Sequence, residues 1–159
     1  MATAHPPRRW ADLLHPSEAL LGPLKCADQQ SVSLIRVGTA WDTVTARWEA
    51  ITITPLERGL AALDALAVPL DGEHPVFADY LRSELIVLVP EGEAAAAVNA
   101  HSGLQGVRAL TTSTWLVVPH GPHGGWAAAW LNRPTPYKTR YVDPARLCET
   151  VLTAETARQ

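Results

Sequence analysis

The stretch Glu49-Ala-Ile-Thr-Ile-Thr-Pro-Leu-Glu-Arg-Gly-Leu-Ala-Ala-Leu-Asp-Ala-Leu66 changes its hydrophobic period at Pro55. Before the proline, β-branched residues at a spacing of two predict a strand or a hairpin. After it, leucines on one stripe predict a helix over Pro55–Leu66. Thr54 suits the N-cap of that helix, and Glu57 lies three residues further on, which is the spacing of a capping box. The chain therefore passes directly from a strand into a helix.

A second segment, Glu84-Leu-Ile-Val-Leu-Val-Pro90, is a nearly continuous apolar run, which is typical of a central strand covered on both faces. Outside these two segments, the pattern predicts strands at residues 31–37, 41–46, 76–81, 107–119 and 126–131, and helices at 91–100 and 143–152. Asp143 is expected to be the N-cap of the last helix. This order predicts an α+β fold with a mostly antiparallel mixed sheet and flanking helices.

The chain has 159 residues, of which 47% are hydrophobic, and this is enough for one domain with a buried core. We expect that domain at residues 31–159, preceded by a loosely attached N-terminal arm at residues 1–30. No apolar run approaches the roughly 18 residues of a membrane span, and the first residues lack the apolar stretch of a secretory signal. A soluble, cytoplasmic protein without a membrane partner is expected.

The charge of the chain is unevenly distributed. Its net charge of −3 argues against an overall basic nucleic-acid binder. Residues 41–100 are strongly acidic, however, whereas residues 101–142 contain four basic side chains and no acid. Such an asymmetry can steer partners to one face of a molecule.

The sequence contains few motifs of known chemistry. The phosphate-binding, nucleotide-binding, hydrolase and zinc-protease patterns are absent. His120 and His123 are a candidate metal pair, but the Gly-Pro between them favours a turn. Cys26 and Cys148 are too far apart in sequence to indicate a metal site, and two separate thiols are expected. No cofactor is expected.

Three segments, taken in order, resemble a known family. They are Ile51–Leu63, Arg82–Gly92, and Gly106–Pro119, the last followed by the turn 120–125 and by Trp130-Leu131. Their layout resembles the N-terminal domain of bifunctional DNA primase/polymerases, the prim-pol branch of the archaeo-eukaryotic primase superfamily. The resemblance implies a primase/polymerase-like fold with an RRM-like palm.

The chemistry of that family is missing at the matching positions. In the family, two Asp residues of the first motif and one of the third bind divalent metals, and a His of the second contacts the incoming nucleotide. Here the Asp pair falls on Thr52 and Thr54, the His falls on or beside Glu84, and the third Asp falls on Arg108. Hydroxyls and a guanidinium do not replace metal-binding carboxylates, so a polymerase built this way is expected to be inactive.

Carboxylates near the lost positions could restore a metal site only from a shifted register. The candidates are Asp42 and Glu49, upstream of the lost pair, and Asp79, upstream of the second motif. A shift of one residue turns a strand side chain to the opposite face of the sheet, so such a replacement is not a simple one.

The first functional hypothesis is a non-catalytic accessory domain that binds nucleic acid or a nucleotide. Its candidate contact residues are Arg108, Arg133, Lys138, Arg140, Trp126 and Trp130. A second hypothesis is a protein-interaction or regulatory domain without nucleotide binding. A third is a small enzyme that uses the densest polar patch, Asp71, Glu73, His74 and Asp79, although Asp71–Pro75 also has the composition of an exposed turn.

Overall fold

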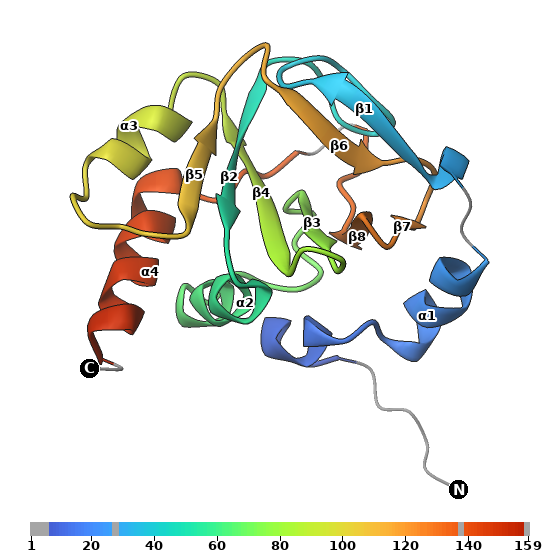
Figure 1. Cartoon of the computed structure of the whole chain (residues 1–159), viewed down its shortest axis with the longest axis horizontal. Coiled ribbons are helices and arrows are strands. Elements are labelled where there is room, and N and C mark those ends of the chain that lie inside the picture. Colours follow the sequence, from blue (N-terminus) through green and yellow to red (C-terminus); the bar gives the residue numbers. More distant parts are fainter. Residues whose placement is uncertain (1–6, 27–28, 137–138, 158–159) are drawn as a thin grey trace, which may run out of the picture.

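The computed structural model describes residues 7–26, 29–136 and 139–157, and it confirms the α+β class (Figure 1). A six-stranded sheet has the strand order β5-β2-β4-β3-β8-β7, and its neighbouring strands pair antiparallel. Its strands are β2 (Trp48–Ile53), β3 (Val76–Asp79), β4 (Glu84–Pro90), β5 (Val107–Leu110), β7 (Gly124–Gly125) and β8 (Ala128–Asn132). A separate two-stranded ribbon is formed by β1 (Val32–Arg36) and β6 (Trp115–Pro119).

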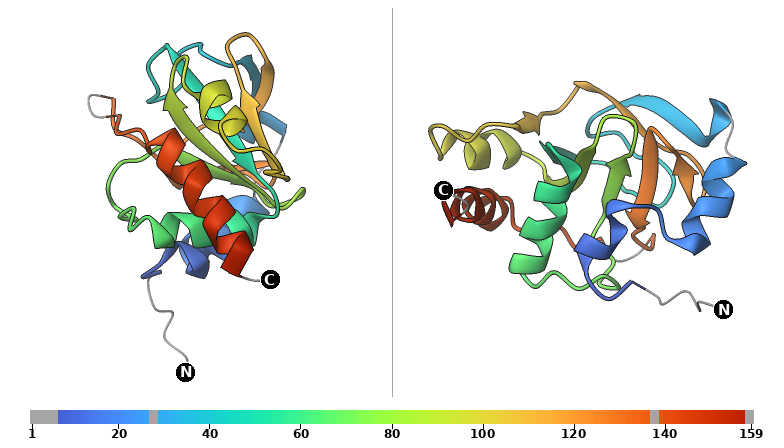
Figure 2. Two further views of the ribbon diagram at one scale, coloured as in Figure 1. Left: turned by 90° about the vertical axis from the view of Figure 1, so that its left-hand side faces the viewer. Right: turned by 60° about the horizontal axis from the view of Figure 1, so that its bottom comes forward.

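The helices cover one face of the sheet. They are α1 (Glu18–Lys25), α2 (Leu56–Ala65), α3 (Ala94–Asn99) and α4 (Pro144–Ala157), with the 3-10 turns η1 (Trp10–Leu14) and η2 (Gln29–Ser31) before the first strand. Buried side chains of α2, α3 and α4 pack against Ile51, Ile53, Val87 and their neighbours, and Figure 2 shows α2 and α4 side by side outside the sheet. Asp143 caps α4 as predicted, since its Oδ1 accepts from the backbone N–H of Ala145.

The β1–β6 ribbon covers part of the other face. Its buried Val118 packs on a second core, together with the half-buried Ile35 and Leu116. That core contains the stacked rings of Trp41 and Trp130, whose centroids lie 5.6 Å apart. The molecule is thus built in three layers: helices, six-stranded sheet and ribbon.

Strand β4 is buried on both faces, as predicted for the run 84–90. Its residues alternate between the two cores, so that Leu85 and Val87 face the helices while Ile86 and Leu88 face the ribbon. The same alternation in β2 places Thr52 on the ribbon side, where it pairs in register with Ile86. The period of two therefore decides which polar side chains lie on the ribbon side of the sheet.

Two local predictions are wrong. The segment 41–46 forms an isolated bridge between Trp41 and Val44 within a turn and not a strand. Helix α2 has Pro55 as its N-cap and no side-chain capping bond. The hydroxyl of Thr54 points instead to the carboxylate of Glu84, and the first N–H of α2 donates to Oγ of Ser83.

The first described part of the N-terminal arm is firmly attached, contrary to expectation. Trp10 is only 1% exposed, and its indole N–H donates to the carbonyl of Val68 at 2.7 Å. The backbone N–H groups of Trp10 and Ala11 donate to the carboxylate of Asp64 on α2. A buried tryptophan with a satisfied N–H anchors the segment more strongly than its prolines suggest.

Within the described ranges, the structure has no helix that is long and apolar enough to span a membrane.

Gly59 provides a test of the packing between α2 and the sheet. A Cβ at this position would lie 2.8 Å from Cβ of Leu85 and 3.3 Å from Cβ of Ile53. We expect Gly59→Ala to lower the free energy of unfolding by about 1–3 kcal/mol, because neither neighbouring Cβ is the flexible end of a side chain. Gly22 in α1 has nothing within 4 Å of a built Cβ. Gly22→Ala should therefore raise the free energy of unfolding by about 0.4–1 kcal/mol. Urea unfolding of the two variants and the wild type shows whether the changes have opposite signs.

Candidate functional site

A cleft of about 420 Å³ lies between the six-stranded sheet and the ribbon. The sheet and its β3–β4 turn contribute charged side chains to it, namely Asp79, Glu84 and Arg108 from strands and Arg82 from the turn. The ribbon contributes Leu34, Trp115 and Val117. The cleft therefore has a charged wall facing an apolar one.

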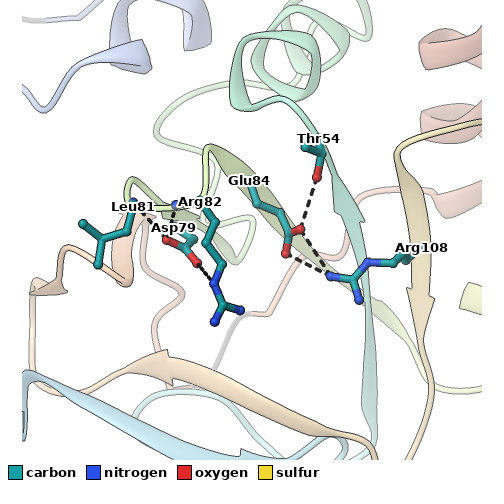
Figure 3. Close-up of polar contacts among 6 residues, drawn as sticks. All are labelled: Thr54, Asp79, Leu81, Arg82, Glu84 and Arg108. Carbon is teal, nitrogen blue, oxygen red and sulfur yellow. Dashed lines mark hydrogen bonds and ion pairs between the residues drawn. The ribbon is translucent and has the colours of Figure 1, made fainter.

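Three contacts of the charged wall link residues of β4, β5 and the end of β2 (Figure 3). Glu84 begins β4, Arg108 lies on β5, and Thr54 follows β2, which runs between them. The Thr54 hydroxyl donates to Oε2 of Glu84 at 3.1 Å, and Nη2 of Arg108 donates to the same oxygen at 3.2 Å. The side chain of Glu84 is 17% exposed and that of Arg108 is 65% exposed. The acid is thus held at the base of the cleft, and the guanidinium extends to solvent.

A second acid and arginine lie beside this group. Asp79 faces Glu84 in register across β3 and β4. Its Oδ1 accepts from the backbone N–H groups of Leu81 and Arg82, and its Oδ2 lies 3.9 Å from Nε of Arg82. Burial raises the pKa of Asp79, and repulsion from Glu84 adds to this, against the N–H bonds and the Arg82 charge, which lower it.

The apolar side of the cleft is unusually exposed. The large hydrophobic side chains of the described residues that are well exposed are Leu34 at 61%, Leu81 at 72%, Trp115 at 54% and Val117 at 37%, and all four line the cleft. The guanidinium carbon of Arg36 lies 4.5 Å from the centroid of the Trp115 ring, which is cation–π distance. Exposed apolar side chains gathered at one place indicate a binding surface.

The structure brings together three of the four positions singled out by the family resemblance. Glu84 contacts both Thr54 and Arg108, as described above. Thr52 is completely buried on the same face of β2, and its hydroxyl has no partner within the described part of the chain. These side chains do not fit the two divalent metals of that family, because the single carboxylate among them is already paired with a guanidinium.

The three carboxylates that could restore a metal site from a shifted register lie in different parts of the structure. Asp42 is bound by Arg133 through two bonds of 2.6 and 2.9 Å. Glu49 faces α3, where it accepts from the backbone N–H of Ala94, and is 5% exposed. Asp79 is the member of this set that lines the cleft.

Two other predicted cationic contacts, Arg133 and Arg140, lie outside the cleft lining. Arg133 is neutralised by Asp42. Arg140 is exposed, and its carbonyl oxygen lies 2.7 Å from Nδ1 of His74. Lys138 falls outside the described residues. Of the three predicted cations that the structure describes, Arg108 is the one that lines the cleft.

The two predicted tryptophans do not lie in the cleft lining either. Trp130 is 5% exposed and packs in the ribbon-side core, so it offers no free ring face for a base. Trp126 is half-buried and packs edge-on against Tyr80. Trp115, which sequence reasoning did not select, is the exposed tryptophan of the cleft. The alternation of 115–119 places Trp115 and Val117 on one face, but it does not tell which face is exposed.

The structure separates Asp79 from the other members of the predicted catalytic patch and does not complete a metal site at the predicted histidine pair within the described residues. Asp79 lies at the far end of β3 from His74, about 16 Å along an extended chain. His120 lies in the turn between β6 and β7, and its Nδ1 is 3.5 Å from Oγ of Ser33 on β1. Among the residues that the structure describes, no three His, Cys, Asp or Glu side chains are grouped to hold a metal, and Cys26 and Cys148 are both free thiols.

No protein-family model, curated protein or solved structure matches the chain. Its function is therefore inferred from the residues of the cleft.

The raised pKa of Asp79 gives a test of the cleft's electrostatics. An ionised Asp79 costs stability above its folded pKa, and this cost disappears below about the ordinary value of 3.8. Asp79→Asn keeps an oxygen that can accept from Leu81 and Arg82. We expect the variant to be more stable than the wild type near neutral pH, by less than about 1 kcal/mol because the site is partly solvated.

Urea unfolding across a pH series is the measurement. The advantage of Asp79→Asn should shrink as the pH falls toward 3.8. A variant that is less stable than the wild type near neutral pH, with a deficit that disappears as the pH falls toward 3.8, would show instead that the ionised carboxylate is needed for the turn at Leu81 and Arg82.

Proposed function

We propose that this chain is a non-catalytic, primase/polymerase-like accessory domain that binds single-stranded nucleic acid or a nucleotide in the cleft. The observation that carries the proposal is the convergence of guanidinium groups with an exposed tryptophan. Arg82 and Arg108 line the charged wall, and Arg36 lies on the ring of Trp115 opposite. Guanidinium groups suit phosphate oxygens, and tryptophan faces stack on bases of any sequence.

The size of the cleft supports a small ligand. Its volume of about 420 Å³ lies in the range of sites that bind small molecules, roughly 300–1,000 Å³. A single nucleotide, or one nucleotide of a longer strand, fits this range. The apolar wall and the charged wall suit its base and its phosphate respectively.

The charge of the cleft implies modest affinity. Two arginines line it, but Asp79 and Glu84 offset them, and the whole chain carries −3. Few phosphates can be neutralised here, so we expect a dissociation constant of about 1–100 μM and a shallow dependence on salt.

The same residues argue against phosphoryl transfer. Two-metal catalysis needs clustered carboxylates that are free to bind cations. The positions that match the family's metal ligands carry Thr52, Thr54 and Arg108. The carboxylate beside them, Glu84, is paired with Arg108. Binding without catalysis is therefore the activity proposed.

A second candidate function is a protein-interaction domain. It is favoured by the four exposed hydrophobic side chains of the cleft, Leu34, Leu81, Trp115 and Val117. A protein ligand would use their apolar area, whereas a base would use the ring face of Trp115 alone. The enzyme hypothesis has no comparable support, since Asp79 lies far from the polar turn around His74.

Fluorescence anisotropy with a labelled oligothymidylate, at about 50 mM salt, tests the proposal. We expect Arg108→Ala and Arg82→Ala each to weaken binding several-fold and to reduce the salt slope by about one. Arg146→Ala is the matched control, because Arg146 is exposed on α4, on the helix side of the sheet, and its loss changes the net charge equally. Absence of binding by the wild type would refute the proposed function.

Two substitutions of Trp115 distinguish stacking from general apolar contact. Trp115→Phe keeps a ring face, whereas Trp115→Leu keeps only an apolar surface. For nucleic acid, Trp115→Leu should weaken binding about 5- to 150-fold while Trp115→Phe retains most of it. Equal affinities of the two variants for the oligonucleotide would contradict base stacking and favour the protein-interaction function.

A further inference from the structure

Arg108 is held more loosely by its carboxylate partner than Arg133 is by its own. Arg133 binds Asp42 with two different nitrogens, Nε at 2.9 Å and Nη2 at 2.6 Å. Arg108 binds Glu84 with one nitrogen, Nη2, which lies 3.4 Å from Oε1 and 3.2 Å from Oε2. These distances are at or beyond the upper end of the range for hydrogen bonds. The first pair has the forked geometry of a strong ion pair, and the second does not.

The unused donors of Arg108 are accessible. A guanidinium carries five N–H groups, and within the described residues Nε and Nη1 of Arg108 have no partner. The side chain is 65% exposed, against 34% for Arg133. An incoming anion can therefore reach Arg108 without first unfolding any element.

Glu84 is anchored independently of Arg108. Its Oε2 also accepts from the Thr54 hydroxyl, and its side chain is only 17% exposed. If Arg108 turned toward a ligand, Glu84 would stay bonded to Thr54 at the base of the cleft. The carboxylate is thus a fixed negative group beside the position that an anionic ligand needs.

Asp79 and Arg82 have a related arrangement. Asp79 is fixed by the backbone N–H groups of Leu81 and Arg82. Its Oδ2 lies 3.9 Å from Nε of Arg82, and the Arg82 side chain is 83% exposed. Each arginine of the charged wall therefore faces an acid that is fixed by other groups. The two acids offset the positive charge of the empty cleft.

On the basis of the proposed function, we infer that Glu84 is a built-in competitor of the ligand's phosphate for Arg108. A phosphate group of a nucleotide or a single strand engages Arg108 by replacing Glu84, which remains on Thr54. Glu84 thereby limits the affinity of the cleft for anions. A ligand that offers only negative charge gains little binding free energy, because its bond to Arg108 replaces the bond of Glu84. A ligand that also stacks a base on Trp115 gains binding free energy from the base.

The test compares Glu84→Gln with the wild type by anisotropy with the same oligothymidylate, and with inorganic phosphate as a competitor. The amide keeps an oxygen for the Thr54 hydroxyl and removes the charge. We expect Glu84→Gln to bind about three- to tenfold more tightly, with a salt slope increased by up to about one, and inorganic phosphate to displace the oligonucleotide at lower concentration.

Two controls isolate the exchange. Glu149→Gln removes one negative charge on the exposed face of α4, and it should leave affinity unchanged. The double variant Glu84→Gln/Arg108→Ala should lose the gain, because the phosphate then has no guanidinium to bind. Circular dichroism shows whether each variant is folded, and Glu84→Ala replaces Glu84→Gln if the latter is not.

The outcomes separate this inference from the proposed function. Binding by the wild type, with equal or weaker binding by both folded Glu84 variants, overturns the competition and leaves the proposed function standing. Binding by the wild type, with tighter binding by Glu84→Gln and no gain in the double variant, supports the competition. Absence of binding by the wild type and by every variant overturns the proposed function, and the inference with it.

Discussion

The burial of β4 on both faces is the constraint on which the rest of the structure depends. A strand with neighbours on each side and layers above and below can carry polar groups only where one layer stops. On the ribbon side of the sheet, β4 changes from Leu88 and Ile86 to Glu84. The neighbouring β5 changes from Leu110 to Arg108, and β2 changes from Ala50 to Thr52 and Thr54. Because these strands are antiparallel, Thr52 lies opposite Arg108 on one side and Ile86 on the other, and Glu84 lies two residues beyond Ile86. The three strands thus become polar within two residues of one another, and the cleft lies there.

Stability alone does not account for the polar groups at this level. Partly exposed ion pairs contribute about 0–1 kcal/mol, so the pairs of Arg108 and Arg82 add little. The hydroxyl of Thr52, buried without a partner in the described chain, costs about 1–3 kcal/mol. Asp79 is also destabilised by burial when it is ionised. Apolar side chains at these positions would give a more stable sheet, and departures from the most stable choice are expected at functional sites.

The hydrophobic periods of the sequence predict the main helices and strands. Each wrong prediction has a physical reason in particular residues. The run 84–90 and the leucine stripe of α2 are long enough for their periods to be unambiguous. The segment 41–46 has strand-like residues, but Trp41 and Val44 pair with each other in a turn and leave no length for a strand. Thr54 has the right residue type for a cap, yet its hydroxyl is used across the sheet by Glu84, a contact between residues 30 positions apart.

The candidate site was predictable in its strands but not in its aromatic residue. Thr54, Glu84 and Arg108 were singled out by the resemblance to a family, and Glu84 contacts the other two. Trp115 and Trp130 both lie in strand patterns, and only the position of the ribbon decides that Trp130 is buried and Trp115 exposed. Period-two reasoning assigns a side chain to a face, whereas exposure depends on which layer covers that face.

The combination of an exposed ring and neutralised arginines restricts the kind of nucleic acid that suits the cleft. In a duplex the base faces are stacked on one another, so Trp115 would have no face to bind, and only the phosphates would remain. Those phosphates would meet an acidic chain with Glu84 and Asp79 beside both arginines of the charged wall. Unpaired nucleotides expose a base face and a phosphate together, and they can use both walls of the cleft. The proposed ligand is therefore single-stranded for a reason that lies in the cleft itself: its charge is too well balanced to hold a polyanion by electrostatics alone.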